Sequence, residues 1–304
     1  MNQEYRQQLS LFCQTHQLPD SYLTMAGNYF LPLADELAAM AKPSSTLLVG
    51  INGCQGSGKS TLSELLTMFL RHHHQLSVAN LSIDDFYHTH AKRQQLADEI
   101  HPLFATRGVP GTHDVDLLQQ SLDQLSKQSG WITIPRFDKS RDDRRSLQEW
   151  DNFLTPADII LLEGWCVGTS AQKDNELLDP INDLELDEDS EGIWRRAVNE
   201  AIKRTYLPLF QKIDTLIMIQ APSFACVYEW RRIQEDKLRQ QVNEAFYATS
   251  RDRSSTMDET QLARFIQHYQ RLTEHMLQTL PSIADSAFTL DRNHQVTRRI
   301  DNES

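Results

Sequence analysis

Residues 46–61 read TLLVGINGCQGSGKST. The run Thr46–Ile51 is short, apolar and continuous, as expected for a strand that is covered on both faces. Gly53–Ser60 matches the pattern G-x-x-x-x-G-K-[ST]. A helical pattern extends from Lys59 to about Leu70, so the motif stands between a strand and a helix, which is the context that a phosphate-binding loop requires. We therefore predict such a loop here.

The residue types in this loop suit a triphosphate. Glycines let the backbone turn tightly and expose its N–H groups to anionic oxygens. The helix that follows adds unpaired N–H groups and the positive end of its dipole. Lys59 brings a full charge to the β- and γ-phosphates, which also makes it a candidate catalytic residue, and Ser60 can place its hydroxyl on Mg²⁺. The predicted nucleotide-binding residues of the loop are Gly53, Cys54, Gln55, Gly56, Ser57, Gly58, Lys59, Ser60 and Thr61.

Other nucleotide-using classes would show further motifs. A guanine reader of the N-K-x-D type is absent from the sequence, as are the H-R-D and D-F-G motifs of protein kinases and the L-S-G-G-Q motif of ABC transporters. The remaining interpretations are an enzyme that acts on a small molecule or a less usual ATPase.

The rest of the chain alternates strand and helix patterns, which predicts an α/β fold of the P-loop NTPase type, in three layers around a mainly parallel sheet. Residues 1 to about 41 read as helical, so we expect a helical appendage over 1–45 and a P-loop domain over 46–304. The motif Phe265, Tyr269, Leu272 and Met276 is expected to be core. Further strands are expected at 77–83, 131–134, 159–162, 214–220 and 287–290, and further helices at 115–127, 193–210, 224–245 and 258–279.

Acidic side chains follow two of these strands. Asp84 and Asp85 come directly after the strand at 77–83, and Glu163 ends the strand at 159–162. Because the carboxyl ends of parallel strands face the ligand crevice, these carboxylates are expected beside the phosphates. Phosphoryl transfer needs a group that orients or deprotonates the acceptor hydroxyl. We favour Asp84 as this base, with Glu163 as the alternative; Glu163 is otherwise expected near Mg²⁺, together with Ser60.

Charge is concentrated in one segment. Nine acidic residues and no Lys or Arg lie between Asp174 and Glu191, and without them the net charge of −12 becomes −3. Runs of charged residues usually form a solvent-exposed surface and have no further role, so we expect a surface insertion over about 168–192. A loop that docks a partner is the alternative.

Composition limits which binding partners and which cellular compartment we expect. Thirty Lys and Arg against 42 Asp and Glu argue against duplex nucleic acid as a partner. The sequence holds no apolar run near the roughly 18 residues that span a bilayer, and no secretory pattern at its start. The four cysteines are scattered, which favours a reducing cytoplasm. We expect a cytoplasmic enzyme that binds neither nucleic acid nor membrane and has no obligate protein partner.

Several stretches together resemble a known group of kinases. Gly53–Ser60, Ile83–Thr89 and Leu162–Gly164 are similar to motifs of the uridine kinase, phosphoribulokinase and pantothenate kinase group. Further stretches resemble the D-glycerate 3-kinase family within it, over roughly residues 46 to 290: Arg107–Asp114, Ile134–Ser140, Glu163–Trp165 and Trp230–Glu235. The resemblance implies ATP and Mg²⁺ as cosubstrates, a small hydroxylated acceptor and activation of that acceptor by Asp84. It also implies that the helix Arg231–Arg239 is a lid, with Arg231 on the phosphates.

The acceptor is expected to be a carboxylate, because an arginine fork holds a small carboxylate in register. The candidate substrate-binding residues are Asp85, Tyr87, Arg107, His113, Arg136, Lys139 and Arg144. The leading hypothesis is transfer of the γ-phosphate of ATP to D-glycerate, which gives 3-phosphoglycerate. The alternatives are a kinase of the same group that acts on a nucleoside, a sugar or a pantothenate-like acid, and an ATP-binding regulator without catalysis.

Overall fold

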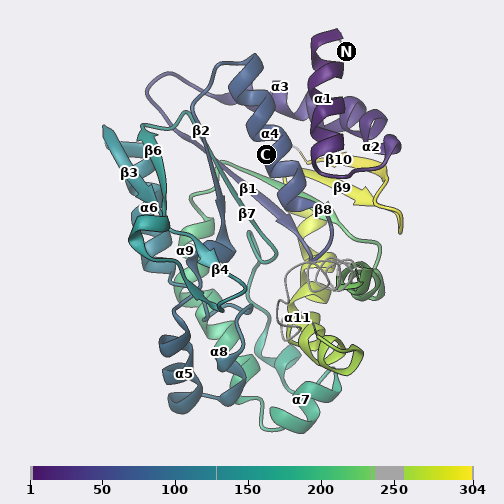
Figure 1. Cartoon of the computed structure of the whole chain (residues 1–304). Coiled ribbons are helices and arrows are strands. Elements are labelled where there is room, and N and C mark those ends of the chain that lie inside the picture. The colour runs from purple at the N-terminus through teal and green to yellow at the C-terminus, as the bar shows by residue number, and fades with distance from the viewer. Residues whose placement is uncertain (1–2, 128, 234, 237–256, 303–304) are drawn as a thin grey trace, which may run out of the picture.

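A six-stranded sheet forms the centre of the computed structural model, which describes residues 3–127, 129–233, 235–236 and 257–302 (Figure 1). The strand order is β10-β9-β8-β1-β7-β2; all neighbours are parallel except β10, which runs antiparallel to β9. The predicted mainly parallel α/β sheet is therefore confirmed. The strands are β1 (Leu47–Gly53), β2 (Val78–Ser82), β7 (Ile159–Gly164), β8 (Thr215–Gln220), β9 (Ser286–Leu290) and β10 (Val296–Asp301).

Helices cover both faces of this sheet. Successive residues of β1 point to opposite faces, as a strand requires: Val49 and Ile51 belong to one core cluster and Leu48 to the other. The first face carries α1 (Gln3–Thr15), α2 (Asp20–Met25), α3 (Leu31–Met40), α4 (Lys59–His73) and the helical residues 224–233. The second carries α6 (Val115–Lys127), α8 (Ile193–Ala201), α9 (Leu207–Phe210) and α11 (Glu259–Thr279).

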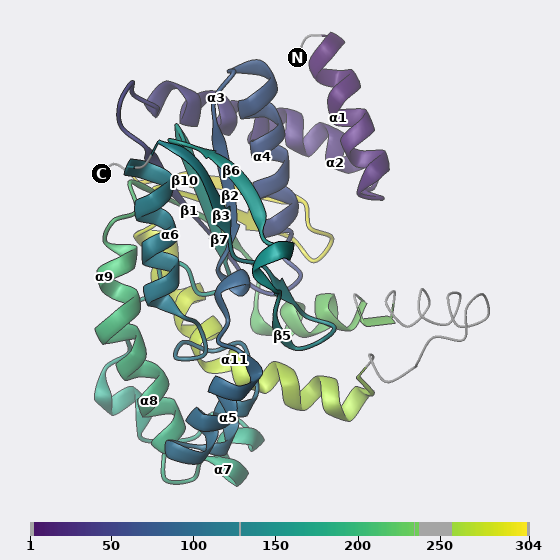
Figure 2. The same cartoon turned by 60° about the vertical axis from the view of Figure 1, so that its left-hand side comes forward.

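Helices also lie at the two opposite ends of the molecule (Figures 1 and 2). Helices α1 to α3 lie at one end, and α5 (His90–Glu99), α7 (Asp183–Glu188) and α8 lie at the opposite end in both views (Figure 2). The short 3₁₀ turns are Ile83–Phe86, Pro102–Ala105, Leu147–Glu149, Asp174–Leu177 and Leu280–Ser282, and π-helical turns cover Ala26–Phe30 and Ile202–Tyr206. None of the helices in the described part of the chain has the length and apolarity that crossing a bilayer requires.

One predicted strand is not in the main sheet. β3 (Gly130–Ile134) pairs antiparallel with β6 (Asp151–Thr155) as a separate ribbon, beside a smaller one of β4 (Phe137–Asp138) and β5 (Asp143–Arg144). Trp131 lies opposite Leu154, and the two side chains are 72% and 54% exposed. The ribbon therefore buries one face only, as antiparallel pairs can, whereas the apolar run Trp131–Ile134 suggested a strand of the parallel sheet.

Two other features differ from the sequence pattern. The helical pattern of residues 1–41 is divided into α1, α2 and α3, with a break before Pro19. β10 is an additional strand that the pattern does not reveal, because its alternating polar residues carry little apolar signal. Of the helix predicted at 224–245, residues 234 and 237–245 lie outside the described residues.

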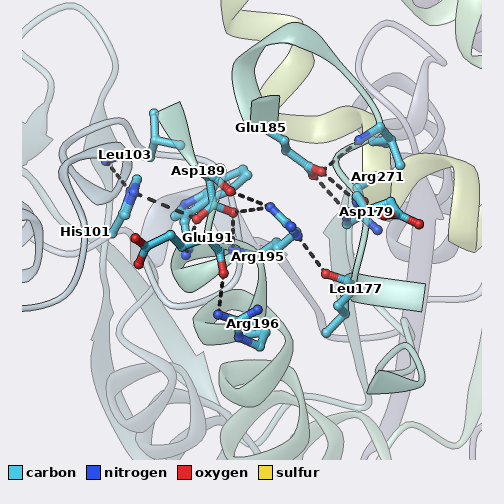
Figure 3. A network of polar contacts seen from close by, with 12 residues as sticks. His101, Leu103, Leu177, Asp179, Glu185, Asp189, Glu191, Arg195, Arg196 and Arg271 are labelled. Carbon is cyan, nitrogen blue, oxygen red and sulfur yellow. Dashed lines mark hydrogen bonds and ion pairs between the residues drawn. The ribbon is translucent and has the colours of Figure 1, made fainter. Parts of the chain in front are cut away.

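The acidic segment 174–191 is folded rather than merely solvated (Figure 3). Glu185 is fully buried and accepts two hydrogen bonds from Arg271 of α11, at 2.7 Å from Nε and 2.6 Å from Nη2. Asp189 is also buried; it pairs with Arg195 at 3.0 Å and accepts from the backbone N–H groups of Trp194 and Arg195. The expectation of a solvated insertion is thus wrong for these two carboxylates, because their partners lie outside the segment.

Candidate active site

The loop between β1 and α4 has the backbone that its glycines predict. Gly56 and Gly58 have φ angles of +80° and +91°, in the left-handed region that glycine favours. A Cβ at Gly53 would lie 2.5 Å from Ser57 Oγ, and one at Gly56 would lie 2.8 Å from Trp230 Cβ. The loop therefore packs closely around the side chain of Ser57 and against Trp230, and Gly58 leads directly into the first turn of α4.

Polar atoms in this loop are left without protein partners. Ser57 Oγ and Gln55 Oε1 are buried and make no hydrogen bond with any residue that the structure describes. Buried polar atoms are almost always paired in folded proteins. Together with the exposed backbone of Gly58, these atoms suit a loop that receives a polar ligand.

Ser60, in the first turn of α4, lies beside Glu163, near the carboxyl end of β7. The hydroxyl of Ser60 donates to Oε1 of Glu163 at 2.9 Å, and Nζ of Lys59 is 4.0 Å from Oε2. Oε2 is buried and accepts no hydrogen bond from the described residues. A hydroxyl and a carboxylate oxygen are hard donors of the kind that Mg²⁺ prefers, so these residues fit a magnesium ion that phosphate and water complete.

Asp84 is the carboxylate that faces two cations. It is the second residue of the 3₁₀ turn that follows β2, and its Oδ2 is 2.6 Å from Nζ of Lys139. Burial would raise the pKa of Asp84, but the charges of Lys139 and Lys59 outweigh burial and hold it well below its ordinary value. The same pair raises the pKa of Lys139. Asp84 is therefore an ionised acceptor next to the phosphate-binding loop.

Tyr87 and His113 form a buried stack behind Asp84. Their rings are 4.4 Å apart and nearly parallel, at 19°, and both side chains are at most 3% exposed. Nδ1 of His113 is 2.7 Å from the hydroxyl of Tyr206, whereas Nε2 is buried with no hydrogen bond to the described residues. Burial lowers the pKa of His113 to about 3. The imidazole is therefore neutral at physiological pH.

Two of the predicted substrate-binding residues form an ion pair with each other. Asp85 accepts from Nη1 of Arg136 at 2.6 Å and from the backbone N–H of Phe137 at 3.2 Å. Arg136 also donates from Nε to Asp151 at 2.8 Å. This bridge joins the turn after β2 to the β3–β6 ribbon, so in this structure its groups are engaged in shaping the site.

Two further arginines of the predicted set are also engaged. Arg144 donates from Nη2 to the carbonyl of Tyr87 at 3.0 Å and to Asp114 at 3.2 Å. Arg107 pairs with Asp142. Lys139 is also paired, with Asp84, but its side chain remains 62% exposed.

Arg231 lies on the helix that follows β8. It forms an ion pair with Glu235 at 3.1 Å, one turn further along. Its backbone N is 3.7 Å from the position of a Cβ on Gly56, so this helix packs directly on the phosphate-binding loop. The predicted lid residues from 237 to Arg239 lie outside the described residues.

Tyr269 is a residue that the sequence indicated only as core. It is buried in α11 as predicted, but its hydroxyl donates to the carbonyl of Arg107 at 3.2 Å. A Cβ on Gly108 would lie 2.2 Å from that hydroxyl, so the loop after Arg107 is shaped around Tyr269. The sequence pattern of α11 does not reveal this contact, because a residue in a buried apolar stripe is interpreted as a core residue.

The fold and this site define a P-loop kinase. A sequence model described as the phosphoribulokinase/uridine kinase family matches residues 48–195, from β1 into α8. The chain belongs to this family and is a P-loop kinase.

Three relatives illustrate the match. The chain is 32% identical over 240 residues to the uncharacterized kinase mug58 of Schizosaccharomyces pombe, covering 73% of this chain and 78% of that protein. It is 28% identical over 255 residues to the chloroplastic D-glycerate 3-kinase of Arabidopsis thaliana, covering 81% of this chain and 51% of that protein. The solved structure of a D-glycerate 3-kinase from Cryptococcus neoformans has a TM-score of 0.71 at 23% identity, covering 93% of this chain and 99% of that one. This last likeness concerns the fold.

Proposed function

We propose that the chain transfers the γ-phosphate of ATP to a hydroxyl of a small hydroxy acid, with D-glycerate as the acceptor and 3-phosphoglycerate as the product. The observation that carries the proposal is the position of Asp84, which contacts Lys139 at 2.6 Å and lies in the field of Lys59 of the phosphate-binding loop. A carboxylate held next to that loop has no evident structural purpose in binding ATP alone.

In this proposal, the residues of the candidate active site have separate roles in the transfer. The loop Gly53–Thr61 holds the triphosphate, and Lys59 offsets the charge that develops on the transferred group. Ser60 and Glu163 would hold Mg²⁺, which when bound neutralises phosphate charge. Asp84 accepts a hydrogen bond from the acceptor hydroxyl and aims it at the γ-phosphate, which is where most of the rate is expected to arise.

The acceptor carboxylate needs a cation that remains accessible to solvent. Lys139 meets this condition best, because its exposed ammonium can turn from Asp84 toward a ligand. We also assign Arg107 to the pocket of the acceptor carboxylate, because its backbone carbonyl accepts the hydrogen bond of the Tyr269 hydroxyl. Asp85, Arg136 and Arg144 shape the surrounding loops through the contacts described above, and Tyr87 and His113 form the apolar floor.

The direct test mixes the purified chain with Mg-ATP and D-glycerate and measures ADP together with 3-phosphoglycerate. Equal amounts of the two products are expected. A panel of hydroxy acids, nucleosides and sugars, read by ADP release, identifies a different acceptor if there is one. ADP release without any acceptor dependence, or no ADP at all at high enzyme concentration, would refute the proposal.

The role of Asp84 is tested by Asp84→Asn. Loss of a positioned base typically lowers turnover by about 10²–10⁴-fold, and ATP binding, measured by calorimetry, should remain. Asp98→Asn, at an exposed position of α5, is the control and should behave as the unmodified chain. Near-normal turnover of Asp84→Asn would transfer the role to Glu163.

A further inference from the structure

Arg93 of α5 is a buried charge to which the proposed transfer assigns no part. Its side chain is 0% exposed. Its three guanidinium nitrogens donate to backbone carbonyls: Nε to His88 at 3.3 Å, Nη1 to Ala105 at 2.7 Å and Nη2 to Asp142 at 2.7 Å. Breaking these bonds would leave buried polar groups unpaired, so Arg93 is held in place from three sides. The three carbonyls belong to loops that carry candidate substrate-binding residues, namely Tyr87, Arg107 and Arg144.

The carboxylate of Asp142 lies between two guanidiniums. Its Oδ2 is 2.8 Å from Nη2 of Arg93, and its Oδ1 accepts from Nη1 of Arg107. Among the described residues, both arginines form their ion pairs with this carboxylate alone. Two positive charges and one negative charge leave one positive charge without compensation, which suits a ligand that carries a carboxylate.

The backbone of Asp142 is in a region that glycine favours. Asp142 lies in the turn between β4 and β5 and has a φ angle of +54°, in the left-handed region. A side chain at such a φ costs conformational free energy that glycine would not cost. An aspartate held in this conformation is therefore expected to contribute through its carboxylate.

Arg107 is the guanidinium of the pair that a ligand can reach. Its side chain is 25% exposed, whereas that of Arg93 is fully buried. Its Cζ is 5.7 Å from the centre of the Phe137 ring, and its Nη2 donates to the carbonyl of Lys139 at 3.4 Å. The ring of Phe137 in turn contacts that of Tyr87, with centroids 5.3 Å apart. These contacts place Arg107 at the same pocket as Lys139.

We propose that Arg93 and Asp142 are positioning residues for Arg107. The buried guanidinium of Arg93 fixes one oxygen of Asp142, and the other oxygen of that carboxylate fixes Nη1 of Arg107. The remaining N–H groups of Arg107 then bind the carboxylate of the acceptor beside the ammonium of Lys139. This assignment rests on the proposed function, and it adds that recognition of the acceptor depends on two residues that do not touch it.

Asp142→Asn removes the charge between the two guanidiniums and little else. Asn adopts the left-handed region readily and has nearly the same volume, so the variant should fold, as urea titration can verify. We expect the KM for D-glycerate to rise at least about fivefold, while the KM for ATP stays unchanged. Asp98→Asn, at an exposed position of α5, is the control and should change neither KM. An unchanged KM for D-glycerate in Asp142→Asn, or an equal rise for ATP, would overturn the proposal.

A double-mutant cycle with Arg107→Ala separates positioning from general support of the fold. Arg107→Ala alone should raise the KM for D-glycerate at least about tenfold. Asp142→Asn should add nothing in that background, because the carboxylate then has no guanidinium to orient. Effects that multiply in the double variant, or an unchanged KM in Arg107→Ala, would show that Asp142 does not act through Arg107.

Arg93→Lys keeps the positive charge but cannot hold three carbonyls and a carboxylate at once. It should raise the KM for D-glycerate in the unmodified background and should have no effect on that KM in the Arg107→Ala background. An effect that persists without Arg107 would remove Arg93 from the proposal. If the unmodified chain phosphorylates D-glycerate and the variants keep its KM, this assignment alone fails. If the unmodified chain phosphorylates no acceptor, the proposed function fails with it.

Discussion

His113 should make the stability of the protein depend on pH. Its imidazole is 3% exposed, and burial lowers its pKa from an ordinary value of 6.5 to about 3. Between these two values the unfolded chain binds a proton that the folded chain excludes, so stability is lost as the pH falls and is regained as the pH rises. From about pH 7 to about pH 5 the loss is about 2 kcal/mol, since each pH unit in this window is worth about 1.4 kcal/mol.

The perturbation is His113→Asn, whose side-chain oxygen can replace Nδ1 opposite Tyr206. The variant is expected to be less stable at every pH, because the stack on Tyr87 is lost. The informative quantity is the change in unfolding free energy between about pH 7 and about pH 5, measured by urea titration with far-UV circular dichroism. This change should be about 2 kcal/mol smaller in the variant than in the unmodified chain.

His90→Asn, at an exposed position at the start of α5, is the matched control and should keep the full pH dependence. Equal pH dependence in His113→Asn and the unmodified chain would show that the folded protein admits a proton at His113. The reasoning from burial, and with it the neutral floor assigned to the acceptor pocket, would then be refuted.

Three further predictions concern separate parts of the molecule. Glu185→Gln leaves the buried guanidinium opposite it without a counter-charge and should lower the unfolding free energy by about 3–5 kcal/mol, whereas Glu188→Gln, which breaks an exposed pair on the same helix, should cost less than about 1 kcal/mol in urea titrations. Gly56→Ala adds a Cβ at a φ of +80° and 2.8 Å from a neighbouring side-chain carbon, so calorimetry should show ATP binding weakened at least about tenfold. Lys139→Ala removes a charge that lowers the pKa of Asp84; kcat/KM should then fall as the pH is lowered toward about 5, a decline that the unmodified chain should lack.

The parts of the fold that the sequence predicted are those that depend on neighbouring residues. β1, the glycine-rich loop and α4 follow one another within residues 47–73, and each has a local pattern of its own. Because the carboxyl ends of parallel strands lie at one edge of a sheet, the sequence also predicts that Asp84 and Glu163 lie at the same edge. Long apolar runs such as Ile159–Leu162 were assigned correctly for the same reason.

The parts that the sequence did not predict depend on partners far away in the chain. Glu185 is read as a surface charge until Arg271, 86 residues later, is seen to hold it. Asp85 and Arg136 are 51 residues apart, and nothing in either neighbourhood shows that they pair. The strand at 131–134 was placed in the wrong sheet because its partner, β6, has too few apolar residues to be recognised.

The low pKa of Asp84 decides how this carboxylate can act. A carboxylate that its neighbours keep ionised is a weak base, so it cannot remove the proton from an alcohol before phosphoryl transfer begins. In the proposed transfer its value would instead be geometric: it would accept the hydrogen bond of the acceptor hydroxyl, and the proton would move only as the oxygen forms its bond to phosphorus. A loose transition state, in which little negative charge is needed on the attacking oxygen, suits such a weak base. Lys139 would therefore have two functions in the proposed transfer, since the charge that keeps Asp84 ionised is also the charge that an acceptor carboxylate would meet.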